Sequence, residues 1–420
     1  MKSDLDTLMQ SKNLDAIIVI GNATYNPPMY YLTGGGHVSA ATLIKKRGGE
    51  AILFCNDMER DEAARSGLKI VPYGTYNYEA LLKEASGDPA LASAIRYKHM
   101  FTDHGVHGRV GIYGYTDLGS AFAVFTHLQK LMPELELVGE TRDDSLFMKA
   151  METKDDTEVA RIRQMGKVTT QVVGRVANYL TGCQIREDEV LLKEGGSPLT
   201  IADVKSRIDL WLAELGAENP EGTIFAIGWD AGVPHSVGTP TDLLRLGQTI
   251  VFDIYPCEAG GGYFYDFTRT WSLGYATPAA QKLYNEVKEV YDKVTQSLDL
   301  NAPFKVYQRM VCEEFEKNGH KTPLNTSAPL EGYVHSLGHG VGLNIHERPW
   351  SGLTATEDNL LKPGVVMTIE PGLYYPTKGM GVRIEDTYWV RQDGTMEILA
   401  EYPYDFVLKM KNWRGNKPAI

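Results

Sequence analysis

Two aspartates on either side of a glycine-rich centre are the first residues that could do chemistry together. Asp253 and Asp266 stand in β-rich runs within residues 249–271, which are typical of a hairpin. A turn at Ala259-Gly260 places the two aspartates directly opposite each other, with Cβ atoms about 4.5–5.5 Å apart. Because like charges opposed in an apolar hairpin are costly, this pairing predicts a cation between them. The alternative is a turn elsewhere, with both carboxylates solvated.

A set of histidines forms the second group of candidates. His335, His339 and His346 are three of the ten histidines and lie within twelve positions, with glycines on both sides of His339. These glycines disfavour a helix and allow the backbone to approach a ligand or another strand closely. His235 lies in a loop just before the predicted hairpin. The alternative is a glycine-rich loop with incidental histidines.

Two glutamates occupy unusual places in β-rich runs. Glu370 ends an apolar strand that begins at Val365, and a Pro-Gly turn follows it. Glu385 lies in the run 381–390, where it shares a strand face with Arg383. Together with the earlier candidates, the glutamates complete a set of possible ligands for a hard or borderline metal ion. The set is Asp253, Asp266, His339, Glu370 and Glu385.

The first 140 residues have the pattern of an α/β unit. Residues 26–36 contain two prolines and three glycines and predict a long loop. No GxGxxG pattern follows a strand, so a dinucleotide site is not expected. Strands are expected at 16–20, 41–44, 51–54 and 110–112, and helices at 1–13, 58–66 and 117–131.

A domain boundary is expected near residues 139–154. After it, the apolar spacing of residues 155–180 predicts a long helix, and further helices are expected at 199–216 and 278–297. β-rich runs lie between and after these helices. The second part of the chain is therefore predicted to be α+β, with helices and strands segregated.

The composition of the 420-residue chain excludes several classes of protein. It contains 43% hydrophobic and 23% charged residues, as ordinary globular proteins do. The net charge of −12 argues against a nucleic-acid or anionic-membrane binder. There is no apolar run of the ~18 residues that a membrane span requires, and the N-terminus lacks a signal-peptide layout. The four cysteines have no CxxC spacing, so reduced thiols in the cytoplasm are the simplest interpretation.

The ordered motifs resemble those of one enzyme family. The chain carries DxxP followed by DxTRT, then HxxGHGVGLxxHE, TIEPGLYY and GVRIED. As a set, these motifs resemble the pita-bread metallopeptidases, which include methionine aminopeptidase, aminopeptidase P and prolidase, with creatinase as a metal-free relative. The chain looks most similar to the Xaa-Pro peptidases. The resemblance covers the whole length and implies an α+β fold, with a creatinase-like α/β N-terminal domain at 1–150 and a pita-bread catalytic domain at 151–420.

The resemblance also implies a site. Carried over by position, the five candidates above would be the metal ligands, and Glu370 would also shuttle the proton of an attacking water. His235, His335, His346 and Arg383 match positions that support the metal or contact the substrate. The four carboxylates would be balanced by two divalent ions (Mn, Co, Fe or Zn, with Mn favoured). The expected assembly is a homodimer.

The expected activity is hydrolysis of an N-terminal Xaa-Pro bond in a small peptide, by an aminopeptidase or a dipeptidase. His335, Tyr333 and Pro349 would line the proline pocket. Arg348 would bind the carboxylate of a dipeptide, unless it is a solvent-facing arginine. One alternative is a metal-dependent non-peptidase hydrolase or lyase of a small amine or osmolyte on the same fold. Another is a binding module without catalysis, as in histone-chaperone and ribosome-associated relatives that lose ligands.

Two spacings depart from the family pattern. The aspartates are one pair of residues further apart than usual, which keeps both on one strand face. The loop from Glu370 to Glu385 is also longer than in compact prolidases. That loop would lie near the substrate, so its length bears on specificity more than on metal binding.

Overall fold

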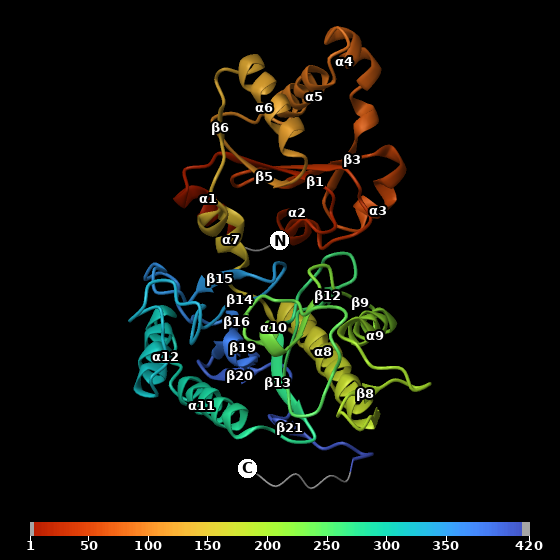
Figure 1. Cartoon of the computed structure of the whole chain (residues 1–420). Coiled ribbons are helices and arrows are strands. Elements are labelled where there is room, and N and C mark those ends of the chain that lie inside the picture. Colours follow the sequence, from red (N-terminus) through yellow and green to blue (C-terminus); the bar gives the residue numbers. More distant parts are fainter. Residues whose placement is uncertain (1–3, 414–420) are drawn as a thin grey trace. The chain divides into compact units, whose positions relative to one another are not determined.

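The structure, a computed structural model, describes residues 4–413 of the chain. The chain divides into two compact units (Figure 1). One contains the residues up to Met151 together with Gly260–Gly262, and the other contains Glu152–Ala259 and the residues from Tyr263 onward. Among the described residues, no helix combines the length and apolar character that crossing a membrane demands.

The first unit is built on one six-stranded sheet with the order β4-β3-β2-β1-β5-β6. The β1–β2 and β2–β3 pairs are antiparallel, and the other pairs are parallel. The predicted run at 16–20 forms β1, which lies inside the sheet with its apolar side chains buried on both faces. The strands are β1 (Ala16–Gly21), β2 (Ala41–Lys46), β3 (Ala51–Cys55), β4 (Lys69–Pro72), β5 (Arg109–Tyr115) and β6 (Glu136–Val138).

Helices lie on both faces of this sheet, with α4, α5 and α6 on one face and α1, α2 and α7 on the other (Figure 1). The predicted strands are confirmed, and so are the helices near 58–66 and 117–131. The helix predicted at 1–13 is confirmed by α1, while its residues 1–3 lie outside the described part of the chain. The helices are α1 (Leu5–Ser11), α2 (Pro27–Thr33), α3 (Arg60–Ala64), α4 (Tyr78–Glu84), α5 (Pro89–Asp103), α6 (Leu118–Leu131) and α7 (Leu146–Met151).

The prediction of a long loop at 26–36 was wrong in part, because α2 occupies its centre. Pro27 and Pro28 stand in the first turn of α2, where a backbone N–H has no helical partner to lose. Gly34 ends the helix with φ at +77°, in the left-handed region that favours glycine. Proline and glycine, which interrupt a helix when they lie inside it, therefore mark the two ends of α2.

The second unit contains two larger sheets. One has the order β10-β11-β13-β21 and the other the order β15-β14-β16-β19-β20. A bridge between Thr268 and Glu385 links them. The first has β10 (Thr223–Ile227), β11 (Thr249–Ile254), β13 (Phe267–Leu273) and β21 (Val407–Leu408). The second has β14 (His339–Gly340), β15 (Glu347–Trp350), β16 (Val366–Ile369), β19 (Asp386–Val390) and β20 (Met396–Ile398).

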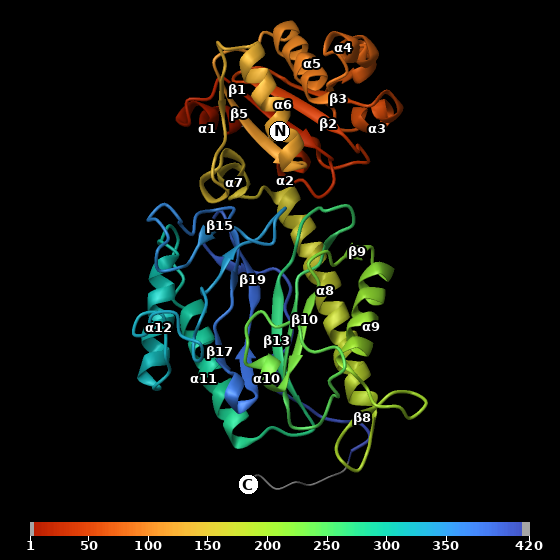
Figure 2. The ribbon, with the colours of Figure 1, turned by 45° about the horizontal axis from the view of Figure 1, so that its top comes forward.

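Helices cover these strands from two sides: Figure 2 shows α8 and α9 on one side and α11 and α12 on the other. The predicted long helix is α8, which begins with a capping box between Asp155 and Glu158. The apolar faces of α11 and α12 form one core with buried residues of β16 and β19. The helices are α8 (Asp156–Gly182), α9 (Ile201–Glu214), α10 (Gly228–Ala231), α11 (Pro278–Thr295) and α12 (Lys305–Lys317).

The remaining strands that the structure describes in this unit form three short pairs. The pair β17–β18 matters for the site because it carries Arg383. The pairs are β7 (Gln184–Ile185) with β8 (Leu191–Leu192), β9 (Ala217–Glu218) with β12 (Cys257–Glu258), and β17 (Gly372–Tyr375) with β18 (Met380–Arg383).

The hairpin of β11 and β13 differs from its predicted register. Asp253 pairs with Thr268 and not with Asp266, so the bend is centred between Gly260 and Gly261. Both glycines have positive φ, +88° and +80°, which favours the bend at that point. Because the pairing shifts by two residues, Asp266 stays on the strand face of Thr268 and becomes a diagonal neighbour of Asp253.

Candidate metal centre

The five predicted ligands lie at or near strand ends in both larger sheets of the second unit. Asp253 is the fifth residue of β11, and Asp266 directly precedes β13. His339 opens β14, Glu370 follows β16, and Glu385 directly precedes β19. Every residue of β11, β13 and β16 is buried, so these strands carry their polar end residues into the interior.

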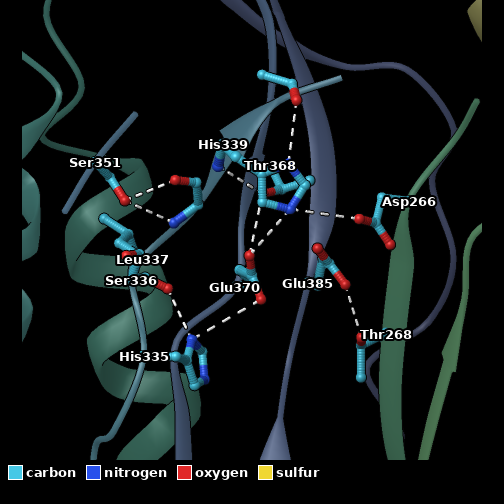
Figure 3. A network of polar contacts seen from close by, with 12 residues as sticks. Asp266, Thr268, His335, Ser336, Leu337, His339, Ser351, Thr368, Glu370 and Glu385 are labelled. Atoms are coloured by element: carbon cyan, nitrogen blue, oxygen red, sulfur yellow. Dashed lines mark hydrogen bonds and ion pairs between the residues drawn. The ribbon is translucent and has the colours of Figure 1, made fainter. Parts of the chain in front are cut away.

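Four of the five side chains converge directly (Figure 3). Asp266, His339 and Glu385 are buried, and one ligand atom from each lies within 4.8 Å of the others. His339 Nε2 is 3.6 Å from Asp266 Oδ2 and 3.4 Å from Glu370 Oε1. The fifth residue, Asp253, is held by a hydrogen bond from Arg383 Nη2 to its Oδ2.

The carboxylates raise one another's pKa. Burial and the charges of Asp253 and Glu370 hold the pKa of Asp266 well above its usual range. Burial and the charge of Asp266 do the same to the pKa of Glu385. Burial raises the pKa of Glu370 to about 8, although Arg383 acts in the opposite direction. A buried cluster of carboxyl groups that raise one another's pKa fits a site that binds a cation.

The donor set fits a divalent cation. Burial lowers the pKa of His339 to about 3, so its imidazole is neutral. Its Nδ1–H donates to the Gly340 carbonyl at 3.1 Å, which leaves the Nε2 lone pair facing Asp266 and Glu370. Among the described residues, the buried Asp253 Oδ1 and Glu385 Oε1 have no hydrogen-bond partner. Oxygen ligands with one imidazole and no thiolate suit Mn, Co, Fe or Zn ions.

Arg383 and Thr268 fix two of these carboxylates. Thr268 Oγ1 donates to Glu385 Oε2 at 2.6 Å and accepts a hydrogen bond from Arg383 Nε at 3.2 Å. Arg383 was predicted to support the site, and its guanidinium does contact Asp253. Thr268 was missed as a functional residue, although it stands inside the quoted DxTRT motif.

Tyr374 links Arg383 to His335. The Tyr374 hydroxyl accepts a hydrogen bond from Arg383 Nη1 at 2.8 Å and lies 2.8 Å from His335 Nε2, to which it donates. The other ring nitrogen of His335 donates to the Ser336 carbonyl at 2.7 Å. Burial lowers the pKa of His335 to about 3, so the ring is neutral. Sequence reasoning assigned no role to Tyr374, although it is the first tyrosine of the TIEPGLYY motif.

The other two predicted histidines have exposed side chains beside the site. The ring centroid of His346 is 4.3 Å from that of His339. His235 follows Pro234, whose carbonyl accepts a hydrogen bond from Arg383 Nη1 at 3.2 Å, so its loop is tied to the site. Exposed imidazoles next to a buried ligand cluster can contact a substrate.

The predicted pocket around His335 needs correction. Tyr333 and Pro349 are buried, whereas His335 is partly exposed, so of these three residues His335 is the one that a substrate can reach. Arg348 is not solvent-facing, because it is only 4% exposed. Its Nη2 donates to Asp358 Oδ2 at 2.9 Å and its Nε lies 3.7 Å from Glu152 Oε1. The Arg348 guanidinium, which was considered for binding a substrate carboxylate, therefore already has Asp358 and Glu152 as partners.

Two family models match the chain. Residues 2–141 match the creatinase/prolidase N-terminal domain, and residues 160–392, more than half of the chain, match metallopeptidase family M24. The chain belongs to metallopeptidase family M24. The predicted family, fold class and enzyme class are therefore confirmed, and M24 membership implies divalent metal ions.

Relatives and solved structures of similar fold cover nearly the whole M24 chain. An uncharacterized peptidase of Staphylococcus aureus (strain MW2) is 27% identical over 395 residues, which are 89% of this chain and 92% of the relative. The prolidase from Pyrococcus horikoshii OT3 has a TM-score of 0.70 at 21% identity, covering 96% and 98% of the two chains. The Xaa-Pro dipeptidase from Bacillus anthracis has a TM-score of 0.74 at 19% identity, covering 96% and 97%. At these identities the structural likeness shows the fold alone.

Proposed function

We propose that this M24 metallopeptidase holds two divalent ions and hydrolyses the bond between an N-terminal residue and a following proline. The observation that carries the proposal is the cluster of Asp266, Glu370 and Glu385 around His339, with the charge of Asp253 also acting on Asp266. Even with Arg383 beside Asp253, one divalent ion would leave this buried site with a net negative charge. Two ions give it a small positive charge, which suits a substrate carbonyl oxygen.

The residues that would hold the ions are Asp253, Asp266, His339, Glu370 and Glu385. When bound, the ions would lower the pKa of a water and polarise the scissile carbonyl. Glu370 takes up the proton of the attacking water and delivers it to the prolyl nitrogen as that nitrogen leaves. His346 and His235, which are exposed beside the cluster, stabilise the negative charge that develops on the carbonyl oxygen.

The preference for proline is supported by what surrounds His335. Its ring is partly exposed and lies 5.3 Å, centroid to centroid, from the rings of both Tyr333 and Tyr374. A ring held by hydrogen bonds at both nitrogens and by aromatic neighbours forms a fixed wall for a pyrrolidine ring. Solved structures with the same fold include a prolidase and an Xaa-Pro dipeptidase, which support the same substrate by analogy.

The proposal extends to the native ion, the compartment and the oligomeric state of the enzyme. Mn is favoured as the native ion because the donors are mostly carboxylate oxygens. The four cysteines are all unpaired, which supports a reducing compartment, the cytoplasm. A homodimer is supported by α6, where Leu118 is 82% and Phe122 is 74% exposed on one helix face.

Matched peptides test the proposed activity. Metal-free protein is supplied with Mn²⁺ or Co²⁺ and assayed on Xaa-Pro, Xaa-Pro-Yaa and Xaa-Ala peptides, and its bound metal is counted by mass spectrometry. We expect about two ions per chain and cleavage only where proline follows the N-terminal residue. Faster cleavage of Xaa-Ala would overturn the proline preference. Metal binding without cleavage of any peptide would favour a small amine or osmolyte as the substrate.

A further inference from the structure

A buried ion pair links Lys154 to Glu347, the residue that follows His346. Lys154 Nζ is 2.7 Å from Glu347 Oε2, and the two side chains are 1% and 0% exposed. Lys154 directly precedes Asp155, the N-cap of α8, and Glu347 opens β15. The pair joins segments that are distant in the sequence, and the proposed chemistry does not use either charge.

The loop between His339 and Glu347 is folded around this pair. Glu347 Oε1 accepts hydrogen bonds from the Asn344 N–H at 2.9 Å and from Asn344 Nδ2 at 3.3 Å. Gly340 pairs with Glu347 in the β14–β15 ladder, which closes the loop. A Cβ at position 342 would lie 2.4 Å from Glu347 Oε2 and 2.8 Å from Lys154 Cε. The last glycine of the GHGVG motif therefore makes room for the ion pair.

Such a pair acts better as an anchor than as a source of stability. Desolvation of two charges offsets most of their attraction, so the net gain is small, but displacing either partner leaves a buried charge unpaired. His346, the residue before Glu347, is exposed and 4.3 Å from His339 between ring centroids. The position of this ring depends on the backbone of its loop, which the Lys154–Glu347 pair fixes at the next residue.

We propose that Lys154 and Glu347 are positioning residues that hold His346 at the reacting carbonyl. The inference rests on the proposed contact between His346 and the substrate. The backbone of His339 is held independently of the Lys154–Glu347 pair. Its N–H donates to Thr368 Oγ1 at 3.1 Å, and β14 pairs with β16. Loss of the Lys154 charge therefore displaces His346 while the metal ligands keep their places.

A double-mutant cycle separates positioning from general support of the fold. The kcat on an Xaa-Pro dipeptide and the metal content are measured for Lys154→Met, for His346→Ala and for the combined variant. We expect Lys154→Met to lower kcat about 10- to 100-fold with metal retained, and to lower it little further when His346 is already alanine. Losses that multiply in the combined variant would overturn the inference. A normal kcat for His346→Ala would instead refute the proposed role of His346.

A readout that needs no substrate completes the test. The Cε1–Hε1 NMR signal of His346, assigned by its loss in His346→Ala, should shift in Lys154→Met. Lys45→Met is the matched control, because Lys45 is 4% exposed and pairs with Asp6 at 2.9 Å in the first unit. The control should leave both kcat and the signal unchanged. An unmoved signal in Lys154→Met overturns the inference, and if that variant does not fold, Lys154→Met/Glu347→Gln, which removes both charges, replaces it.

Discussion

At the scale of single residues, the donors around the site matter as much as the ligands. Arg383 reaches Asp253, Thr268 and Tyr374 with different nitrogens of one guanidinium. This fork is planar and rigid, so the groups that it contacts are fixed relative to one another. Asp253 is thereby oriented before any ion arrives, and His335 is oriented through Tyr374.

Tyr374→Phe tests this orientation. The variant removes the hydroxyl between Arg383 and His335 and keeps the ring, so we expect kcat on Xaa-Pro peptides to fall by roughly tenfold, the effect of about 1.4 kcal/mol on the barrier. Steady-state kinetics with metal analysis measures it. Tyr284→Phe is the control, because it removes a buried hydroxyl that donates to the Tyr404 carbonyl. An equal loss in both variants would reduce Tyr374 to a structural residue.

The acid cluster predicts how pH affects the metal-free protein. Burial raises the pKa of Glu370 to about 8, and the pKa values of Asp266 and Glu385 also lie above their usual range. Glu370 therefore binds more protons in the folded protein than in the unfolded chain between pH ~4.3 and about 8, so its contribution to stability falls as pH rises through this window. The lowered pKa values of His335 and His339 act in the opposite direction, but only below pH ~6.5. We expect the metal-free Tm to be lower at pH 8 than at pH 6.

Added Mn²⁺ should reverse this trend, because ions bind ionised carboxylates and release protons. Thermal denaturation with a chelator and with Mn²⁺ at both pH values measures the effect. Glu370→Gln is the control and should flatten the metal-free profile. A metal-free Tm that is the same at pH 6 and pH 8 would contradict the assigned pKa shifts.

At the scale of elements, the register of β11 and β13 decides which side chain meets Glu385. Because Asp253 pairs with Thr268, Thr268 is the residue of β13 that bridges to Glu385. Thr268→Val keeps the shape and removes the hydroxyl, so we expect metal affinity to fall about 10- to 100-fold, as for other supporting partners of ligands. Metal titration by calorimetry measures it.

Thr169→Val is the control for this variant. Thr169 is a fully buried threonine of α8 that donates to the Met165 carbonyl. Its replacement should change stability and leave metal affinity unaltered. Unchanged affinity in Thr268→Val would show that Glu385 needs no fixed partner.

The elements also show what the sequence could and could not predict. The ligand candidates could be predicted because a carboxylate such as Glu370 ends an apolar strand, and burying an unpaired carboxylate costs free energy. The register was missed because a one-residue change in the position of a glycine bend shifts every cross-strand pair. Tyr374 and the buried state of Arg348 depend on contacts distant in sequence, which no local pattern encodes. The helix α2 was missed because proline and glycine were taken only as signs of a loop.

At the scale of the whole molecule, the surface of the first unit bears on assembly. Helix α6 contains one lysine, one histidine and no acidic residue, an unusual composition for a helix with an exposed face. Leu118 and Phe122 stand one turn apart and are 82% and 74% exposed. Tyr115, at the end of β5, is 52% exposed. The proposed homodimer would cover these apolar side chains.

Phe122→Asp tests the homodimer. A charge placed in an apolar interface would be desolvated without a partner, so we expect the variant to be a monomer by light scattering at concentrations where the wild type is a dimer. Met58→Asp is the matched control, because Met58 is 86% exposed in the same unit and lies outside α6. It should remain a dimer, and both variants should keep their metal, since all five proposed ligands belong to the second unit. A monomeric wild type, or a dimer that survives Phe122→Asp, would show that α6 does not carry the assembly.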